Sequence, residues 1–284
     1  MPRLSSFCGF ALLVGLIACA GCGGGATAFL GARDREIQDA TRALETARDD
    51  TQRAKAYSSR GSAYSEKARY SRVLKLITDE KYQRLFDLAI ADHDQAVALN
   101  PASADVYFNR AQAYYDRGSG DLIYDTNPYA GKPRNNRWLN AAAADFEKSI
   151  TIDPGNSLAF DRLGLAYESN GESDKAIRAY TQEMALDRHL GTLRLADAYC
   201  VIGYERQLQN DFHAAAEAYE KSTEFGTADD HTCPVEPFEA MVTIYTNEIL
   251  YDKAWEAVHR ARKVGARISS EPIERLRKSS GRSE

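Results

Sequence analysis

The chain has 284 residues, 44% of them hydrophobic and 27% charged, and a formal net charge of −5 at pH 7. This composition is ordinary for a folded protein that buries a core, and it argues against disorder over most of the chain. The Lys and Arg residues are interspersed with acidic residues rather than gathered in a stripe, which argues against a nucleic-acid-binding protein.

The first 18 residues are typical of a signal peptide. Arg3 and the amino terminus supply positive charge, and residues 7–18 form an apolar run of twelve residues. That run is too short to cross the ~30 Å hydrocarbon core of a bilayer as a helix. It ends in Leu16-Ile17-Ala18-Cys19, which resembles the cleavage box of bacterial lipoproteins. An ordinary secretory signal, cleaved near Ala20, is the alternative.

The lipoprotein resemblance implies that Cys19 is lipidated and becomes the new amino terminus. Each buried CH2 group of an acyl chain contributes ~0.8 kcal/mol, so a multiply acylated cysteine holds a domain on a bilayer without a membrane-spanning helix. Residues 19–33 would then be the lipidated N-terminus and a flexible tether. Because Ala20 rather than an aspartate follows Cys19, the resemblance implies the bacterial cell envelope, on the outer membrane and facing the periplasm.

Beyond the tether the sequence predicts an all-α fold. Apolar residues recur at spacings of three and four, and no long segment alternates with the period of two that a strand requires. Residues 34–48 form one predicted N-terminal helix, because their apolar residues share a face. Residues 271–278 form a predicted C-terminal capping helix, followed by a disordered tail over 279–284.

The region between these helices is repetitive. One unit carries Phe160, Leu163, Gly164, Tyr167, Ala176 and Tyr180. The same frame returns at Gly164, Gly203 and Val242, with 39 residues between successive positions. This spacing resembles the tetratricopeptide repeat, a 34-residue helix pair, and we expect the extra residues between pairs, around 189–193 and 230–234.

Two earlier units, residues 57–101 and 107–154, have the same frame but contain insertions. The resemblance therefore implies a right-handed α-solenoid of about five helix pairs, extending over residues 34–278 and including the N- and C-terminal extra helices.

The two insertions differ in composition. Residues 65–86 lack Gly and Pro, and Thr78 precedes two acidic residues as an N-cap would, so a tall helical hairpin is expected. Residues 116–140 are rich in Gly, Pro and Asn and contain Tyr124, Tyr129 and Trp138. These aromatic residues either make contacts with a ligand or fold back onto their own helices.

The sequence does not predict an enzyme. It contains no metalloprotease, serine-hydrolase, P-loop or dinucleotide-binding motif, and its five His residues are dispersed, so no cofactor or metal is expected. Cys200 and Cys233 would both remain in an oxidising compartment. They either form a disulfide between neighbouring helix pairs or remain two buried thiols.

In tetratricopeptide repeat folds the first helix of each pair lines a concave groove. Carried over residue by residue, this resemblance places fifteen side chains in the groove: Ser58, Ser62, Ser65, Phe108, Gln112, Tyr115, Asp161, Leu165, Glu168, Cys200, Tyr204, Gln207, Glu239, Thr243 and Thr246. The stripe is mildly acidic with aromatic residues in its middle, so the expected ligand is a basic or amphipathic peptide or a helix.

The resemblances together imply a membrane-anchored periplasmic lipoprotein that acts as a scaffold or adaptor for other envelope proteins. The alternative is an envelope receptor that binds a small molecule or a glycan through the aromatic loop at residues 116–140.

Overall fold

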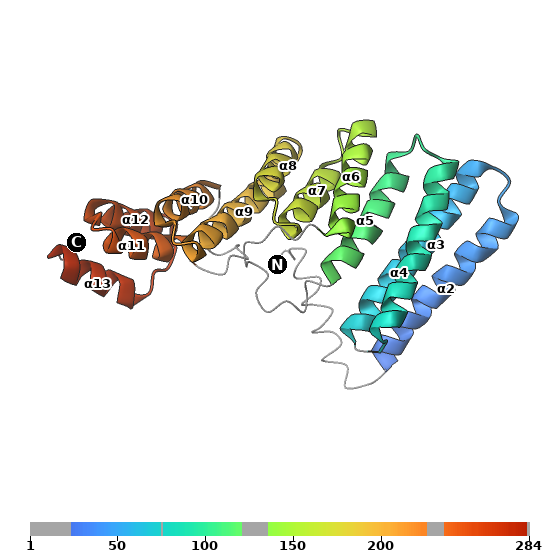
Figure 1. Cartoon of the computed structure of the whole chain (residues 1–284), viewed down its shortest axis with the longest axis horizontal. Helices are drawn as coiled ribbons and strands as arrows, with labels where there is room; N and C mark the ends of the chain where they lie inside the picture. Colours follow the sequence, from blue (N-terminus) through green and yellow to red (C-terminus); the bar gives the residue numbers. More distant parts are fainter. Residues whose placement is uncertain (1–23, 75, 121–135, 226–235, 283–284) are drawn as a thin grey trace. The chain divides into compact units, whose positions relative to one another are not determined.

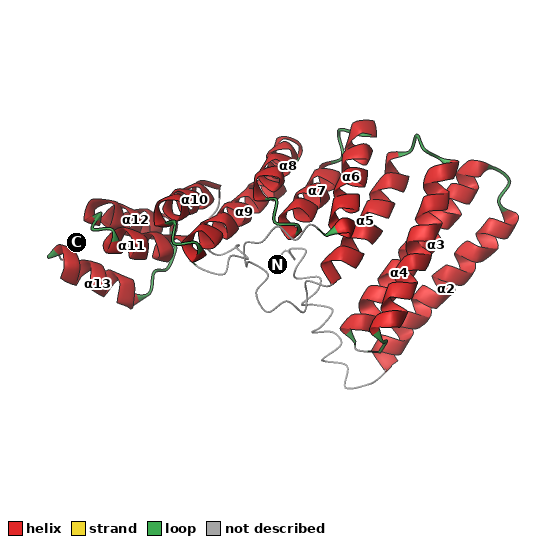
Figure 2. Ribbon diagram, in the orientation of Figure 1, coloured by secondary structure: helices red, strands yellow, loops and turns green. Residues whose placement is uncertain are grey.

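The computed structural model describes residues 24–74, 76–120, 136–225 and 236–282 (Figure 1). Every regular element in these ranges is an α-helix, which confirms the predicted all-α fold, and Figure 2 shows that turns and loops join the helices. None of the described helices is both long and apolar enough to cross a membrane. The chain divides into two compact units, Met1–Gly120 and Asp121–Glu284.

The first unit contains four described helices: α2 (Gly24–Thr46), α3 (Asp50–Val73), α4 (Asp79–Leu99) and α5 (Ala104–Gly120). Helices α3 and α4 form an antiparallel hairpin, α2 packs on α3, and α5 packs against both α3 and α4. The Thr78 side chain accepts a hydrogen bond from the Lys81 amide and caps α4. The predicted tall hairpin over residues 65–86 is therefore confirmed.

Helix α2 begins ten residues earlier than predicted, so the expectation of a flexible tether is wrong for residues 24–33. The lengthened α3 explains the difference, because it extends the surface on which α2 packs. The Phe29 and Tyr70 rings lie edge to face with centroids 4.3 Å apart. Arg33 forms an ion pair with Glu66, and Lys67 forms another with Asp34.

The second unit contains eight described helices: α6 (Arg137–Ile152), α7 (Ser157–Ser169), α8 (Ser173–Leu186), α9 (Arg188–Leu208), α10 (Phe212–Phe225), α11 (Pro237–Asn247), α12 (Tyr251–Val264) and α13 (Ser270–Ser280). The predicted pairs α7/α8, α9/α10 and α11/α12 are confirmed, and each second helix packs on the first helix of the next pair. The predicted capping helix is confirmed as α13, which packs on α11 and α12 and buries Leu276. It extends to Ser280, so the predicted disordered tail is wrong for residues 279–280.

Small residues in the repeat frame allow the two helices of a pair to approach closely. A Cβ atom at Gly164 would lie 2.2 Å from the Tyr180 ring, and one at Gly203 would lie 2.6 Å from the Tyr219 ring. In the α3/α4 pair a Cβ at Gly61 would lie 2.8 Å from the His93 ring. Any side chain at these three positions would overlap its neighbour, so glycine is required at Gly61, Gly164 and Gly203.

Residues 189–193, expected between helix pairs, lie inside α9 instead. The Asp187 side chain accepts hydrogen bonds from the His189 and Leu190 amides, which starts α9 directly after α8. A Cβ at Gly191 would lie 2.3 Å from the Met184 amide nitrogen, so glycine lets the extended helix pass close to α8. Residues 230–234, the other expected spacer, lie outside the described residues.

Candidate functional site

The first unit has a groove of about 760 Å³ between α2 and α3, with Asn109 of α5 at its edge. The predicted stripe residues Ser58 and Ser62 line it. The Asn109 amide donates a hydrogen bond of 2.9 Å to the Ser58 hydroxyl and so connects α5 to α3. The groove walls carry mostly Ala and Ser side chains, which are small and leave the space open.

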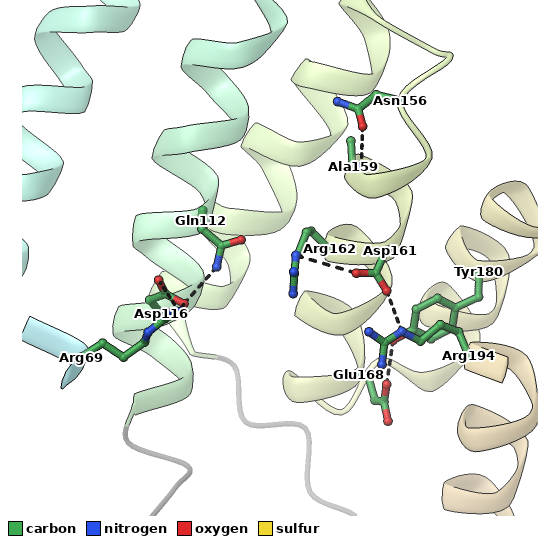
Figure 3. Close-up of polar contacts among 10 residues, drawn as sticks. All are labelled: Arg69, Gln112, Asp116, Asn156, Ala159, Asp161, Arg162, Glu168, Tyr180 and Arg194. Atoms are coloured by element: carbon green, nitrogen blue, oxygen red, sulfur yellow. Dashed lines mark hydrogen bonds and ion pairs between the residues drawn. The ribbon is translucent and has the colours of Figure 1, made fainter. Parts of the chain in front are cut away.

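The predicted residues of α5, Phe108, Gln112 and Tyr115, are all half-buried. The Gln112 side-chain amide donates a 2.9 Å hydrogen bond to Asp116, and the Arg69 guanidinium lies 3.4 Å from the same carboxylate (Figure 3). Gln112 is therefore held in one orientation by a partly buried polar network. The two aromatic residues keep some of their surface exposed.

In the second unit, Asp161 of α7 lies between two arginines (Figure 3). The Arg194 Nε lies 2.6 Å from one Asp161 oxygen and the Arg162 Nε lies 3.7 Å from the other. Asp161 is only 2% exposed, so it positions the arginines rather than offering an open carboxylate to a ligand. The long α9 supplies Arg194, and the sequence frame alone did not indicate this contact.

Glu168 lies two turns further along α7 and accepts a 2.8 Å hydrogen bond from the Tyr180 hydroxyl (Figure 3). Burial raises the pKa of Glu168, against the Tyr180 hydrogen bond and the charge of Arg194, which lower it. Burial also raises the pKa of Glu205 on α9, and the charge of Glu168 contributes. The charge of Glu168 therefore disfavours ionisation of Glu205, whereas Arg194 favours ionisation of Glu168 and Arg206 favours ionisation of Glu205.

The predicted residues of α9 repeat this arrangement one helix pair later. Gln207 is 39 residues after Glu168, and its side-chain oxygen accepts a 2.9 Å hydrogen bond from the Tyr219 hydroxyl. Tyr204 and Leu165 are half-buried on their helices. The Glu239 carboxylate of α11 accepts a 2.9 Å hydrogen bond from the Ser269 amide, so it holds the start of α13.

Several predicted residues lie outside the described ranges, namely Cys19, Tyr124, Tyr129 and Cys233. Trp138 is described and half-buried in the first turn of α6, with the Arg137 guanidinium 4.4 Å from its ring centroid. Cys200 is fully buried and belongs to a disulfide. Its pairing with Cys233 stays a prediction.

Sequence reasoning missed Glu183 of α8, which is completely buried. Neither of its carboxylate oxygens has a hydrogen-bond partner among the described residues. Burial raises its pKa to about 8, and the charges of Asp161 and Asp187 act in the same direction. The charges of Arg194 and Arg162 lower the pKa. A signal was available, because Glu183 is three residues after Tyr180 on the buried face. The equivalent residues of the other second helices are small and fully buried: Ala96, Ser149, Ser222 and Ala261.

In the described part of the chain, no three His, Cys, Asp or Glu side chains are grouped so that they could hold a metal ion. The described residues form polar networks on helix faces and an open groove, which suit binding of another polypeptide.

Comparison with known families supports the repeat frame. A family described as TPR repeat matches residues 86–118, and two families described as tetratricopeptide repeat match residues 146–178 and 196–225. The last match covers α10 and the later part of α9. The chain is also 28% identical over 102 residues to small glutamine-rich tetratricopeptide repeat-containing protein 2 of Saccharomyces cerevisiae. That alignment covers 36% of this chain and 24% of the yeast protein, about a quarter of its length.

Solved structures with similar folds include two of MamA and one of BtubC from P. vanneervenii. The first MamA structure is 19% identical, with a TM-score of 0.39, and the alignment covers 72% of this chain and 99% of that one. The second is 18% identical, with a TM-score of 0.41, and covers 79% and 96%. BtubC is 15% identical, with a TM-score of 0.43, and covers 84% and 91%.

Proposed function

Because the chain is a tetratricopeptide repeat protein, we propose that it is a scaffold that binds other proteins through the first helices of its pairs. The ligand in the second unit is a basic or amphipathic peptide or helix on α7 and α9. The observation that carries this proposal is the pair of half-buried carboxylates, Glu168 on α7 and Glu205 on α9, on two first helices that contact each other. Carboxylates that are partly buried near one another gain stability when a Lys or Arg side chain comes close.

The chain itself suggests the variant that tests this surface. Gln207 occupies the position of Glu168 in the next pair and accepts the same tyrosine hydrogen bond, so Glu168→Gln removes the charge and keeps the acceptor. We expect the double variant Glu168→Gln and Glu205→Gln to weaken binding of a Lys- and Arg-rich amphipathic peptide by about tenfold, or about 1.4 kcal/mol. Fluorescence anisotropy at low and physiological salt measures the effect.

The matched control is Glu274→Gln, which removes an exposed carboxylate from α13. It should leave the affinity unchanged, because it lies on the terminal helix rather than on α7 or α9. Equal affinity of the wild type, the double variant and the control would refute the basic-ligand surface.

The proposal includes a cellular location. The sequence Leu16-Ile17-Ala18-Cys19 supports lipidation of Cys19, and the residue after it supports the outer membrane, with the scaffold facing the periplasm and its partners among envelope proteins. Metabolic labelling with an alkyne fatty acid tests the anchor. Cys19→Ser should abolish the label and release the protein from membranes, whereas Cys22→Ser should do neither. Label that survives in Cys19→Ser would contradict the proposed anchor.

In-cell crosslinking of the full chain tests the partner class. Envelope proteins recovered with the wild type and lost with the double glutamate variant would support the scaffold. Recovery of no protein would favour the small-molecule or glycan receptor described above.

A further inference from the structure

Helix α2 occupies the place of a second helix in the repeat. Within the two units, second helices pack on the first helix of the following pair, as α4 does on α5, α8 on α9 and α10 on α11. Helix α2 packs on α3 in the same way. It is also the first described helix, so no described helix stands before it as the first member of its pair. Among the described helices, the solenoid therefore begins with a second helix.

The complete pairs define where a first helix belonging to α2 would lie. A first helix contacts its own second helix and the first helix of the next pair: α3 contacts α4 and α5, and α7 contacts α8 and α9. A first helix belonging to α2 would contact α2 and α3. The groove of about 760 Å³ lies along these same two helices.

The groove has the dimensions and surface of a helix-binding site. Its α2 wall extends from Glu36 to Thr46, which is about 16 Å, or three helical turns, at 1.5 Å per residue. The small side chains that line it belong to both helices: Ala40, Ala43, Ala47, Ala56, Ser59 and Ser62. Walls of Ala and Ser allow close approach of a helix backbone, and the incoming helix then has to supply the large apolar side chains.

The charged residues at the rim specify the orientation of that helix. Glu36 and Asp39 lie on the α2 side and are exposed, and Lys55 lies on the α3 side and is also exposed. A complementary helix carries basic residues along the border that faces α2 and an acidic residue along the border that faces α3. Uniformly acidic or uniformly basic helices would meet repulsion on one side.

We infer that the groove between α2 and α3 binds an amphipathic helix of a partner protein, which completes the first helix pair of the solenoid. This inference rests on the proposed function, binding of another protein, but assigns a second surface in the other unit. The occupant has Leu- or Tyr-sized residues on one face, basic residues bordering one side and an acidic residue bordering the other. If the chain is cleaved at Cys19 as proposed, residues 19–23 lie between the new amino terminus and α2, fewer than the eleven residues of the α2 wall.

The test uses the full chain and a synthetic peptide of about 16 residues with this pattern, labelled with fluorescein, together with a scrambled peptide of the same composition. Ala43→Trp fills the groove from α2 and should weaken binding at least about tenfold. Ala98→Trp is the matched control, because Ala98 is an exposed alanine of α4 and is not among the residues that line the groove. Glu36→Lys should weaken binding about fivefold and restore it for a peptide whose basic border is replaced by Glu.

The outcomes separate this inference from the proposed function. Loss of binding in Ala43→Trp but not in the Glu168→Gln, Glu205→Gln protein supports the groove. Loss of binding in the Glu168→Gln, Glu205→Gln protein but not in Ala43→Trp shows that the groove is not the binding site and supports the surface on α7 and α9. Equal binding of the scrambled peptide, or no binding by the wild type, overturns the groove as well. A photocrosslinker at position 43 that reacts with residues 1–23 of the same chain would show that the occupant is not a partner protein.

Discussion

Each of the two units buries one titratable side chain that has no hydrogen-bond partner among the described residues, and the two side chains have opposite chemistry. In the first unit it is His93 of α4, and in the second it is Glu183 of α8. Both side chains are 0% exposed and both lie on the packed face of a second helix. Burial disfavours the charged form of each group, so the histidine is kept neutral by losing its proton and the glutamate by keeping it.

The two units should therefore respond to pH in opposite directions. Burial lowers the pKa of His93 from 6.5 to about 4, and the charge of Arg110 contributes. The unfolded chain takes up a proton at this histidine first on acidification, so the first unit loses stability as the pH falls below about 6.5. Burial raises the pKa of Glu183 from 4.5 to about 8. Its unfolded form loses a proton first, so the second unit loses stability as the pH rises from 4.5 toward 8.

The largest expected effect is that of Glu183 on the second unit. Between pH 5 and pH 8 the wild type should lose about 3 kcal/mol of unfolding free energy at α8 and α9, since each pKa unit corresponds to about 1.4 kcal/mol. Glu183→Gln replaces the protonated carboxyl with a neutral amide of similar shape and should remove this loss. Hydrogen-exchange protection of the α8 and α9 peptides, corrected for intrinsic exchange rates, measures it.

Glu217→Gln is the matched control, because Glu217 is an exposed residue of α10. It should retain the wild-type dependence on pH. If protection of α8 in the wild type is the same at both pH values, Glu183 is ionised in the folded protein, and the contrast between the units fails.

His93 should produce a somewhat smaller effect in the first unit. Between pH 7 and pH 5 the protection of α3 and α4 should fall by about 2 kcal/mol, because the folded unit does not accept the proton that the unfolded chain binds. His93→Phe should flatten this profile; the precedent is Phe146, which occupies the equivalent position of α6 and is fully buried. A profile that remains steep in His93→Phe would assign the acid sensitivity to another group. His213→Gln changes a histidine whose side chain is 82% exposed, so the dependence of α3 and α4 protection on pH should stay as in the wild type.

The sequence predicted these packing positions but not their energetics. Gly61, Gly164 and Gly203 were identified from the repeat frame, and the structure confirms that each faces a ring of the partner helix. Periodicity is a local property, so helices and their pairing can be derived from it. Whether a ring finds a polar partner depends on the far end of the neighbouring helix. Tyr180 and Tyr219 reach acceptors there, whereas His93 does not among the described residues.

The candidate site was harder to predict for the same reason. The stripe transferred from the family included Asp161 and Glu239, which the structure shows to be engaged by Arg194 and by the start of α13. Both partners come from segments with no fixed place in the repeat, an extended α9 and a terminal capping helix. The groove between α2 and α3 was not predicted, although Ser58 and Ser62 and the predicted helix over residues 34–48 line it, because the role of α2 as a second helix depends on tertiary contacts.

The smallest expected effect concerns a residue without a titratable group, and it separates backbone strain from charge in the second unit. The turns α7/α8, α9/α10 and α11/α12 each place one residue in the left-handed region: Gly171 with φ 76°, Asn210 with φ 61° and Ile249 with φ 62°. These positions are 39 residues apart, and a β-branched side chain is strained there, by roughly 1–2 kcal/mol. Ile249 is also 71% exposed, so burial offsets little of that strain.

Ile249→Asn should therefore stabilise α11 and α12 by about 1 kcal/mol, equally at pH 5 and pH 8, because the strain does not depend on a proton. Asn210→Ile should lower the unfolding free energy of the preceding pair by a similar amount. A loss of stability in Ile249→Asn would show that the exposed isoleucine makes a stabilising contact that outweighs the strain.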